Sequence, residues 1–172
     1  MRREEPVRIS RLSPRKLKAE QLREVLSTVP FNALLGMRLH RTHRDGITLA
    51  CTLRDDLRNR AGMAHGGVAA TLADAAVGIA IHRHFGGKRP VTTVELKINY
   101  FQPVAEGRLF ARSHLLRIGS TLCVGRVDLY DEHSQSIGVA IVTYLFLDAR
   151  RGQPLNSPPA AASGKNRRPP KE

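Results

Sequence analysis

The sequence predicts an α+β domain in which one antiparallel sheet packs against a buried central helix. The first observation is a long apolar segment from Gly66 to Ile81, in which Thr71 and Asp74 are the only polar side chains. A helix that is apolar on every side is expected to be enclosed by other structure. The second observation is the order of the elements: a helix, two strands, this long helix and then four strands. That order favours one antiparallel sheet with a helix buried against it.

The first predicted element is a surface helix within residues 13–30. Ser13 is its expected N-cap, Pro14 occupies its first helical position, and Pro30 stops it. The leucines and valines between these residues fall near helical spacing, which predicts one apolar face. A short turn over residues 31–36 follows.

A β-hairpin is predicted next. Residues 37–43 and 47–53 are strand-like runs, and Asp45-Gly46 between them is a dipeptide typical of two-residue hairpin turns. Residues 55–64 are expected to form an irregular loop that leads into the central helix.

The second half of the chain is predicted to be strand after strand. The segment GGKRP ends the central helix near Phe85, because two glycines and a proline do not continue a helix. In the strand that follows, simple alternation places Val94, Leu96, Ile98 and Tyr100 on one face. Three further strands are predicted over residues 109–118, 121–130 and 136–147.

Length and charge indicate one domain with basic ends. The expected division of the 172 residues is a basic N-terminal extension (1–30), a folded domain (31–150) and a disordered tail rich in Pro, Ala and basic residues (151–172). The net charge is +13, and the two ends carry about half of it. The chain shows no sequence pattern typical of a nucleic-acid-binding module, so nucleic acid is the less favoured partner. A moderately basic domain also suits a small molecule that bears phosphates.

The sequence further predicts a cytoplasmic protein. The N-terminus has charges but no apolar segment of the kind found in signal peptides, and no apolar run is long enough to span a membrane. Cys51 and Cys123 show neither a CxxC pattern nor a neighbouring His cluster, so we expect two buried thiols and no metal site.

The motif HGGVAATLADAA, which begins at His65, is the most informative segment for function. Gly66 and Gly67 allow the backbone to approach another group closely, because no Cβ stands in the way. Asp74 follows within the apolar helix, where a carboxylate is costly unless it is paired or has a task. One interpretation is an aspartate that only hydrogen-bonds nearby backbone. The adjacent glycine pair favours a functional carboxylate.

This motif, the order of elements and the later segment VELKINYFQPV resemble the hotdog-fold acyl-CoA thioesterases of the phenylacetate-pathway (PaaI-like) type. The resemblance covers about residues 31–148. It implies a sheet wrapped around the central helix, two subunits paired edge to edge and active sites at their interface. It also implies acyl-CoA as substrate, a homodimer or dimer of dimers as the assembly, and no metal, organic cofactor or membrane partner.

The resemblance assigns roles to individual residues. Asp74 matches the family's catalytic acid, Gly66 its backbone donor and Asn59 its active-site asparagine, although an Asx turn is an equally good interpretation of Asn59. Thr93 matches a residue that holds the attacking water, yet alternation places it on the polar face. His65 is expected to brace the glycine turn. The expected substrate-binding residues are Gly67, Tyr100, Phe101, Gln102, Pro103, Val104, Ala105 and Arg117, where Ala105 stands in place of a lysine found in some relatives.

Helix geometry gives an independent argument for a dimer. Asp74 lies eight residues after Gly66, which corresponds to about 12 Å along one helix. One helix therefore cannot present both groups to the same thioester. A second copy that runs antiparallel beside the first would bring its own Asp74 to the first copy's Gly66.

Several alternatives remain open at this stage. Asp74 can act as a general base on water or as a nucleophile. A hotdog enoyl-acyl hydratase would place a histidine beside the acid, and a non-catalytic acyl-CoA-binding regulator would lack the acid. His82 and His84 are interpreted as charge complements to the C-terminal end of the helix, since no third metal ligand accompanies them.

Overall fold

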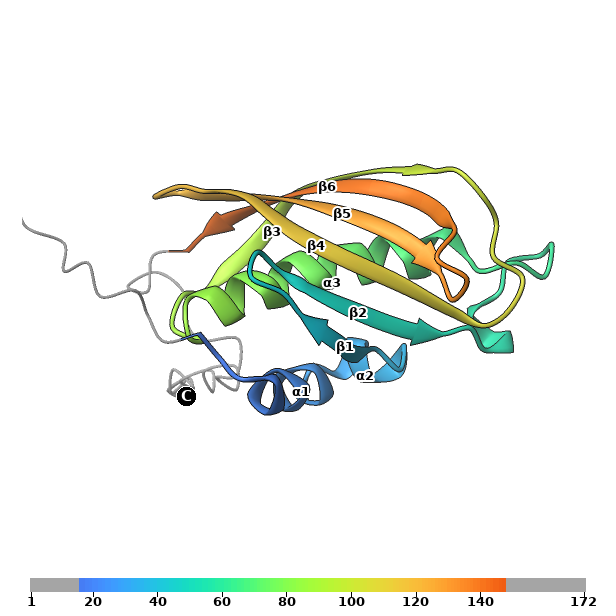
Figure 1. The fold of residues 1–172 in the computed structure, drawn as a ribbon, viewed down its shortest axis with the longest axis horizontal. Coiled ribbons are helices and arrows are strands. Elements are labelled where there is room, and N and C mark those ends of the chain that lie inside the picture. Colours follow the sequence, from blue (N-terminus) through green and yellow to red (C-terminus); the bar gives the residue numbers. More distant parts are fainter. Residues whose placement is uncertain (1–15, 148–172) are drawn as a thin grey trace, which may run out of the picture.

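The computed structural model describes residues 16–147 and shows a six-stranded antiparallel sheet curved around one long helix (Figure 1). The helices are α1 (Ala19–Thr28), α2 (Pro30–Leu34), the 3₁₀ helix η1 (Asp55–Leu57) and α3 (Gly66–His84). The strands are β1 (Arg38–Thr42), β2 (Ile47–Thr52), β3 (Val91–Tyr100), β4 (Arg108–Ile118), β5 (Leu122–Asp131) and β6 (Ser136–Phe146). The strand order is β1-β2-β4-β5-β6-β3. The predicted α+β hotdog architecture is confirmed.

The core lies between α3 and the concave face of the sheet. Leu72, Ala76 and Val77 of α3 are fully buried, as expected for a helix enclosed by the sheet. Close approach depends on Gly125 in β5, because a Cβ there would lie 2.7 Å from the methyl groups of Val77. The small residue lets the helix pack directly onto the strand backbone.

The N-terminal helix starts later than the sequence predicted. Its N-cap is Lys18, whose N–H donates to Gln21 Oε1 at 3.0 Å, whereas the predicted cap at Ser13 lies outside the described residues. Leu22 and Leu26 are buried in the same core as α3, so α1 belongs to the packed domain. Pro30 ends α1 as predicted, but it also begins the short helix α2 where a turn was expected.

The β1–β2 hairpin is confirmed, although its turn differs from the prediction. Four residues connect the strands, and the His43 N–H closes the connection on the Gly46 carbonyl at 2.9 Å. Gly46 does not have a positive φ. Its lack of a side chain serves a close approach instead, because a Cβ would lie 1.9 Å from the carbonyl oxygen of Ser113 in β4.

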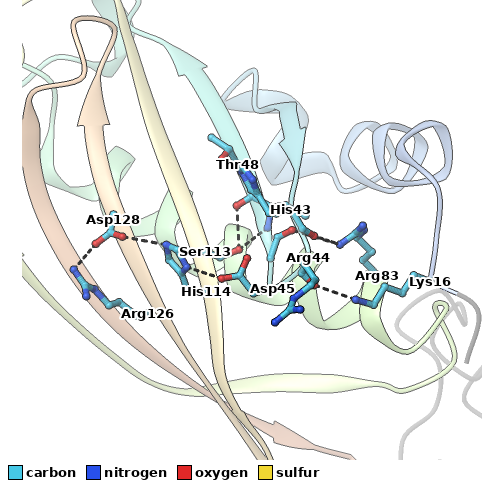
Figure 2. A network of polar contacts seen from close by, with 12 residues as sticks. Lys16, His43, Arg44, Asp45, Thr48, Arg83, Ser113, His114, Arg126 and Asp128 are labelled. Carbon is cyan, nitrogen blue, oxygen red and sulfur yellow. Dashed lines mark hydrogen bonds and ion pairs between the residues drawn. The ribbon is translucent and has the colours of Figure 1, made fainter. Parts of the chain in front are cut away.

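A polar network fastens this hairpin to the sheet (Figure 2). His114 of β4 contacts Asp45 of the hairpin at 2.8 Å through Nδ1 and Asp128 of β5 at 3.1 Å through Nε2. Arg126 Nη2 in turn donates to Asp128 at 2.7 Å. The hydrogen bond from His114 is the main reason that the pKa of Asp45 lies below its ordinary value.

Strand β3 departs from simple alternation at its start. Its register against β6 shifts between Thr93 and Glu95, so that Val94 is an extra residue with 53% of its surface exposed. The prediction that Val94 shares a face with Leu96 and Ile98 is therefore wrong. The same bulge turns Thr93 toward α3, which matters for the site.

Three further expectations concern the ends, the thiols and the membrane. The predicted tail over residues 151–172 lies outside the described residues, as does most of the charged N-terminus. Cys51 and Cys123 are both buried free thiols, and burial raises the pKa of Cys123 to about 11. Within residues 16–147, no helix combines the length and apolar character needed to cross a membrane.

Candidate functional site

Two cavities open along α3, one at each of the two functional positions of the motif. The cavity at the start of the helix, here called the Gly66 pocket, has a volume of about 470 Å³. The cavity at the middle of the helix, the Asp74 pocket, has a volume of about 700 Å³. The two cavities share no lining residue. This separation agrees with the argument that one helix cannot present both groups to a single thioester.

The first turn of α3 presents a backbone donor to the Gly66 pocket. His65 is the N-cap, and its Nδ1 accepts from the Gly67 N–H at 3.0 Å, so the predicted bracing role of His65 fits the geometry. The Tyr100 hydroxyl donates to the Gly66 carbonyl at 2.8 Å. Within the described residues, no hydrogen bond uses the Gly66 N–H. This N–H lies at the partially positive end of the helix, where it is available to an oxyanion.

Asn59 holds the loop that leads to α3. Its Oδ1 accepts from the Ala61 N–H at 2.9 Å and from the Met63 N–H at 3.2 Å, which is the Asx-turn geometry considered as one interpretation. Asn59 also lines the Gly66 pocket. The turn uses the side-chain oxygen, and within the described residues no hydrogen bond uses the amide nitrogen.

Most of the predicted substrate-binding segment lies at the Gly66 pocket. The predicted residues that line it are Asn59, His65, Gly66, Tyr100, Phe101, Gln102, Pro103 and Val104. Gly67 and Ala105 do not line it. The Ala105 carbonyl instead accepts a hydrogen bond from the Arg58 guanidinium, which ties this segment to the loop before α3.

The Asp74 carboxylate is held on one side by two hydroxyl groups. Thr93 Oγ1 donates to Asp74 Oδ1 at 2.9 Å, and the Tyr144 hydroxyl lies 2.9 Å from the same oxygen. Thr93 reaches the carboxylate because of the bulge in β3, and its role in holding the attacking water stays a prediction. With Oδ1 occupied, Oδ2 is the oxygen free to act on a bound molecule.

Tyr144 is a site residue that the sequence analysis missed. It lies in β6 opposite Thr93, and its hydroxyl is also 2.9 Å from the Asp74 backbone carbonyl. Burial and then the neighbouring Asp74 charge raise the pKa of Tyr144, so the phenol stays protonated and acts as a donor. Gly78 makes room for it, because a Cβ there would lie 2.6 Å from the phenolic oxygen.

Arg117 is not brought together with either cavity in one chain. It is exposed near the end of β4, eight residues beyond Leu109, which lines the Gly66 pocket. Eight residues of strand span about 26 Å. Any role of Arg117 in binding the same ligand therefore remains a prediction.

The two histidines at the end of α3 were interpreted as positive charges that complement the helix C-terminus, and their surroundings disfavour that charge. Burial lowers the pKa of His82 and of His84, which favours neutral rings. His82 lines the Asp74 pocket, eight residues and about 12 Å along the helix from the acid. Within residues 16–147, no three His, Cys, Asp or Glu residues are grouped as a metal site.

Comparisons with known proteins agree with this geometry. Residues 61–137 match the model of the thioesterase superfamily. The medium/long-chain acyl-CoA thioesterase YigI of Escherichia coli is 30% identical over 132 residues, which cover 68% of this chain and 85% of YigI. The chain belongs to the thioesterase superfamily. The predicted resemblance and the predicted enzyme class, a thioester hydrolase, are thereby confirmed.

Solved structures of the superfamily share the fold. A mutant of the phenylacetic acid degradation protein PaaI from Thermus thermophilus has a TM-score of 0.62 and 26% identity, covering 69% of this chain and 99% of PaaI. A thioesterase from Haemophilus influenzae has a TM-score of 0.73 at 20% identity, covering 80% of this chain and 95% of that one. At that identity, the second comparison supports the fold alone.

Proposed function

We propose that this thioesterase hydrolyses acyl-CoA to a free acid and CoA, with Asp74 as the reactive carboxylate. The observation that carries the proposal is the fixed Asp74 carboxylate, held through one oxygen by Thr93 and Tyr144 in a largely apolar pocket. The Gly66 N–H at the start of α3 supplies the hydrogen-bond donor for the carbonyl oxygen of the thioester. The relationship to YigI supports acyl-CoA as the substrate and a medium or long aliphatic chain as one candidate for the acyl group.

In the first of two possible routes, Asp74 acts as a general base. Its carboxylate takes a proton from water, and the resulting hydroxide attacks the thioester carbon. The carbonyl electron pair moves onto oxygen, where the Gly66 N–H stabilises the negative charge. Collapse of this intermediate breaks the C–S bond, and the CoA thiolate takes the proton from Asp74.

In the second route, the Asp74 carboxylate attacks the thioester carbon itself. The CoA thiolate leaves, and water then hydrolyses the mixed anhydride. Single-turnover hydrolysis in isotopically labelled water distinguishes the routes. Labelled oxygen in Asp74 identifies the nucleophilic route, because water then attacks the Asp74 carbonyl of the mixed anhydride, whereas a general base puts the label into the product acid alone.

The proposal includes a homodimer in which each site combines Gly66 of one subunit with Asp74 of the other. Support comes from the two separate cavities on α3 and from the outer edge of β3, which pairs only with β6 within the described residues. This strand leaves Val94 and Tyr100 more than half exposed, and Phe101 directly after it is equally exposed. Open apolar strand edges tend to be covered by another strand.

A thiol-release assay across saturated, unsaturated and aryl acyl-CoAs tests the proposal, with Asp74→Asn as the matched variant. Asparagine keeps the shape of the side chain but cannot take the proton or attack, so turnover should fall at least about a hundredfold. Circular dichroism should show that the variant is folded. An Asp74→Asn protein with wild-type turnover would remove Asp74 from the mechanism.

The same assay separates the remaining alternatives. An acyl-CoA-binding regulator would bind the substrate without releasing thiol. An enoyl-acyl hydratase would add water to a carbon–carbon double bond and leave the thioester intact. Within the described residues of one chain, the Asp74 side chain hydrogen-bonds to Thr93 and Tyr144 and to no histidine, and His65 Nδ1 is engaged by the Gly67 N–H, which favours hydrolysis over hydration.

A further inference from the structure

Asn32 is a buried amide in the wall of the Asp74 pocket. Only 8% of its surface is exposed, and it lines the cavity together with Asp74. Its backbone carbonyl accepts from the Met37 N–H at 3.0 Å, and its side chain has no hydrogen bond to another described residue. Neither side-chain polar atom is among the fully buried ones that lack a partner, so the amide is accessible from the cavity. Buried amides nearly always have a partner, because removing the group from water without one is costly.

The fold explains why Asn32 lies at this cavity. Leu17 N–H donates to the carbonyl of Arg83 at 3.2 Å, which fixes the start of α1 beside the end of α3. Buried Leu22 and Leu26 hold α1 against the core, and Pro30 then starts a new helix in a different direction. Phe31 and Leu34 of α2 are more than half exposed, and Phe31 also contributes to the rim of the Asp74 pocket. Asn32 alone in this short helix is buried.

Three other polar side chains of the cavity, those of Thr71, Thr93 and Tyr144, already have hydrogen-bond partners. Thr93 and Tyr144 hydrogen-bond to Asp74, and Thr71 donates to the Gly67 carbonyl at 2.8 Å. His82 is favoured in its neutral form by burial. Asn32 is therefore an uncharged donor and acceptor facing a cavity whose remaining wall is mostly apolar.

We propose that Asn32 binds an oxygen atom carried by the acyl group, so that the enzyme selects oxygenated acyl groups over plain hydrocarbon ones. The inference rests on the proposed function, because it takes the Asp74 pocket as the acyl site. A hydrocarbon chain in contact with Asn32 would leave the amide without a partner. A hydroxyl or oxo group would satisfy it. Sites built to hydrogen-bond a substrate oxygen discriminate strongly against the analogue that lacks it.

The experiment compares substrates that differ by one oxygen atom. Octanoyl-CoA is measured against the same chain with a hydroxyl at carbon two, three or eight and with an oxo group at carbon three. Phenylacetyl-CoA is measured against its ring-hydroxylated counterpart, which separates an aryl source of the oxygen from an aliphatic one. For the wild-type enzyme, kcat/KM should be at least about tenfold higher for one oxygenated member than for its hydrocarbon partner.

Asn32→Leu keeps a similar volume and removes both polar atoms. It should abolish the preference, mainly by raising kcat/KM for the hydrocarbon substrate and lowering it for the oxygenated one. Val29→Ala is the matched control, since Val29 lines the same cavity without a polar group. It should change both members of each pair by the same factor.

Other roles of Asn32 predict different results. If the amide only oriented the attacking water, Asn32→Leu would slow all substrates equally. If it were a structural residue, Asn32→Leu would lower Tm, whereas loss of an amide that makes no hydrogen bond to the described protein should leave Tm equal or higher. Either result, or a wild-type enzyme without any preference, would overturn the proposal.

Failure of the proposed function has a separate signature. If no acyl-CoA releases thiol, binding of octanoic acid and of its hydroxylated forms is measured by calorimetry with the wild-type and Asn32→Leu proteins. Tighter binding of an oxygenated acid that disappears in Asn32→Leu would support the specificity even then. Equal binding by both proteins would overturn it.

Discussion

One oxygen of the Asp74 carboxylate is hydrogen-bonded and the other is free, because two neighbouring hydroxyl side chains bind the same oxygen. Thr93 and Tyr144 converge on Oδ1 from adjacent strands, at 2.9 Å each. Gly78, one turn further along α3, leaves the space that the Tyr144 ring needs. A carboxylate oriented in this way presents Oδ2 to the cavity without a search over rotamers, which is the form of preorganisation that catalysis requires.

Tyr144→Phe tests this orientation directly. The variant removes one donor to Asp74 and keeps the ring that packs in the core, so kcat should fall at least about tenfold, the loss expected for one hydrogen bond to a charged group. KM should change little, because the phenol contacts the acid rather than the leaving group. Unchanged kcat in the thiol-release assay would show that Thr93 alone orients Asp74.

The residues of the site differ in how visible they are in the sequence. Asp74 and Gly66 stand out because a carboxylate interrupts an apolar helix and a glycine pair precedes it. Tyr144 does not stand out, since its strand is mostly apolar and its partner lies 70 residues away. Asn32 falls in a segment predicted to be a turn, where a buried amide has no local signal.

At the scale of elements, the continuous apolar run and the GGKRP segment after it located α3 within one residue of its observed end. Periodicity failed where the register shifts, because an extra residue at Val94 exchanges the faces of β3 at that point. The turns at Asn59 and at Asp45-Gly46 were also visible in the sequence. The need for glycine at position 46 comes from the close approach of β4, however, and not from the conformation of the hairpin turn. Local patterns therefore predict the elements, and tertiary contacts decide their details.

The last turn of α3 should make stability depend on pH. His82 and His84 have lowered pKa values because of burial, so the unfolded chain binds more protons than the folded chain below about pH 6.5. This contribution to stability is complete above that pH and is lost as the pH falls through it. Tm measured from pH 8 to pH 5 should decline on the acid side.

A substitution identifies the source of this decline. His82→Leu removes one of the buried rings and should flatten the profile of Tm against pH between about pH 6.5 and 5. His133→Leu is the matched control, because His133 is exposed in the β5–β6 turn. The profile of the control should follow that of the wild type. A His82→Leu profile parallel to the wild type would exclude His82 as the cause.

The end of β4 provides a test of the leaving group. Arg117 is exposed beside the Gly119 turn, where a guanidinium and a glycine backbone can both approach a phosphate. If Arg117 binds CoA, Arg117→Ala should raise KM for acyl-CoA severalfold and leave kcat nearly unchanged. A short thioester without the nucleotide should be hydrolysed equally by both proteins. Equal losses on both substrates would assign Arg117 to structure or chemistry, and no change would leave it as a surface charge.

At the scale of the whole molecule, the proposed division of the site between Gly66 and Asp74 would require a second copy of the chain. The Gly66 pocket and the Asp74 pocket lie about 12 Å apart along α3, too far for one thioester. Antiparallel pairing places the Gly66 pocket of each subunit beside the Asp74 pocket of the other. Such a dimer has two equivalent sites, and each depends on both chains.

Mixing two inactive variants distinguishes this arrangement from a site within one chain. Asp74→Asn lacks the reactive carboxylate, and Gly66→Val places a branched side chain where the carbonyl must approach and within 3.2 Å of the Tyr100 hydroxyl. In a mixed dimer, one site carries both substitutions and the other carries neither. About half of the dimers are mixed after free exchange of equal amounts, and each has one intact site, so activity should return to roughly a quarter of the wild-type level.

The control is a proof of exchange. Differently tagged subunits are co-purified after mixing, and each variant alone is assayed under the same conditions. Activity that rises with the fraction of mixed dimer places Gly66 and Asp74 in one site across the interface. Complete exchange without any return of activity would mean that the two groups serve different sites, and the separation of the two cavities on α3 would then reflect two independent functions of the helix.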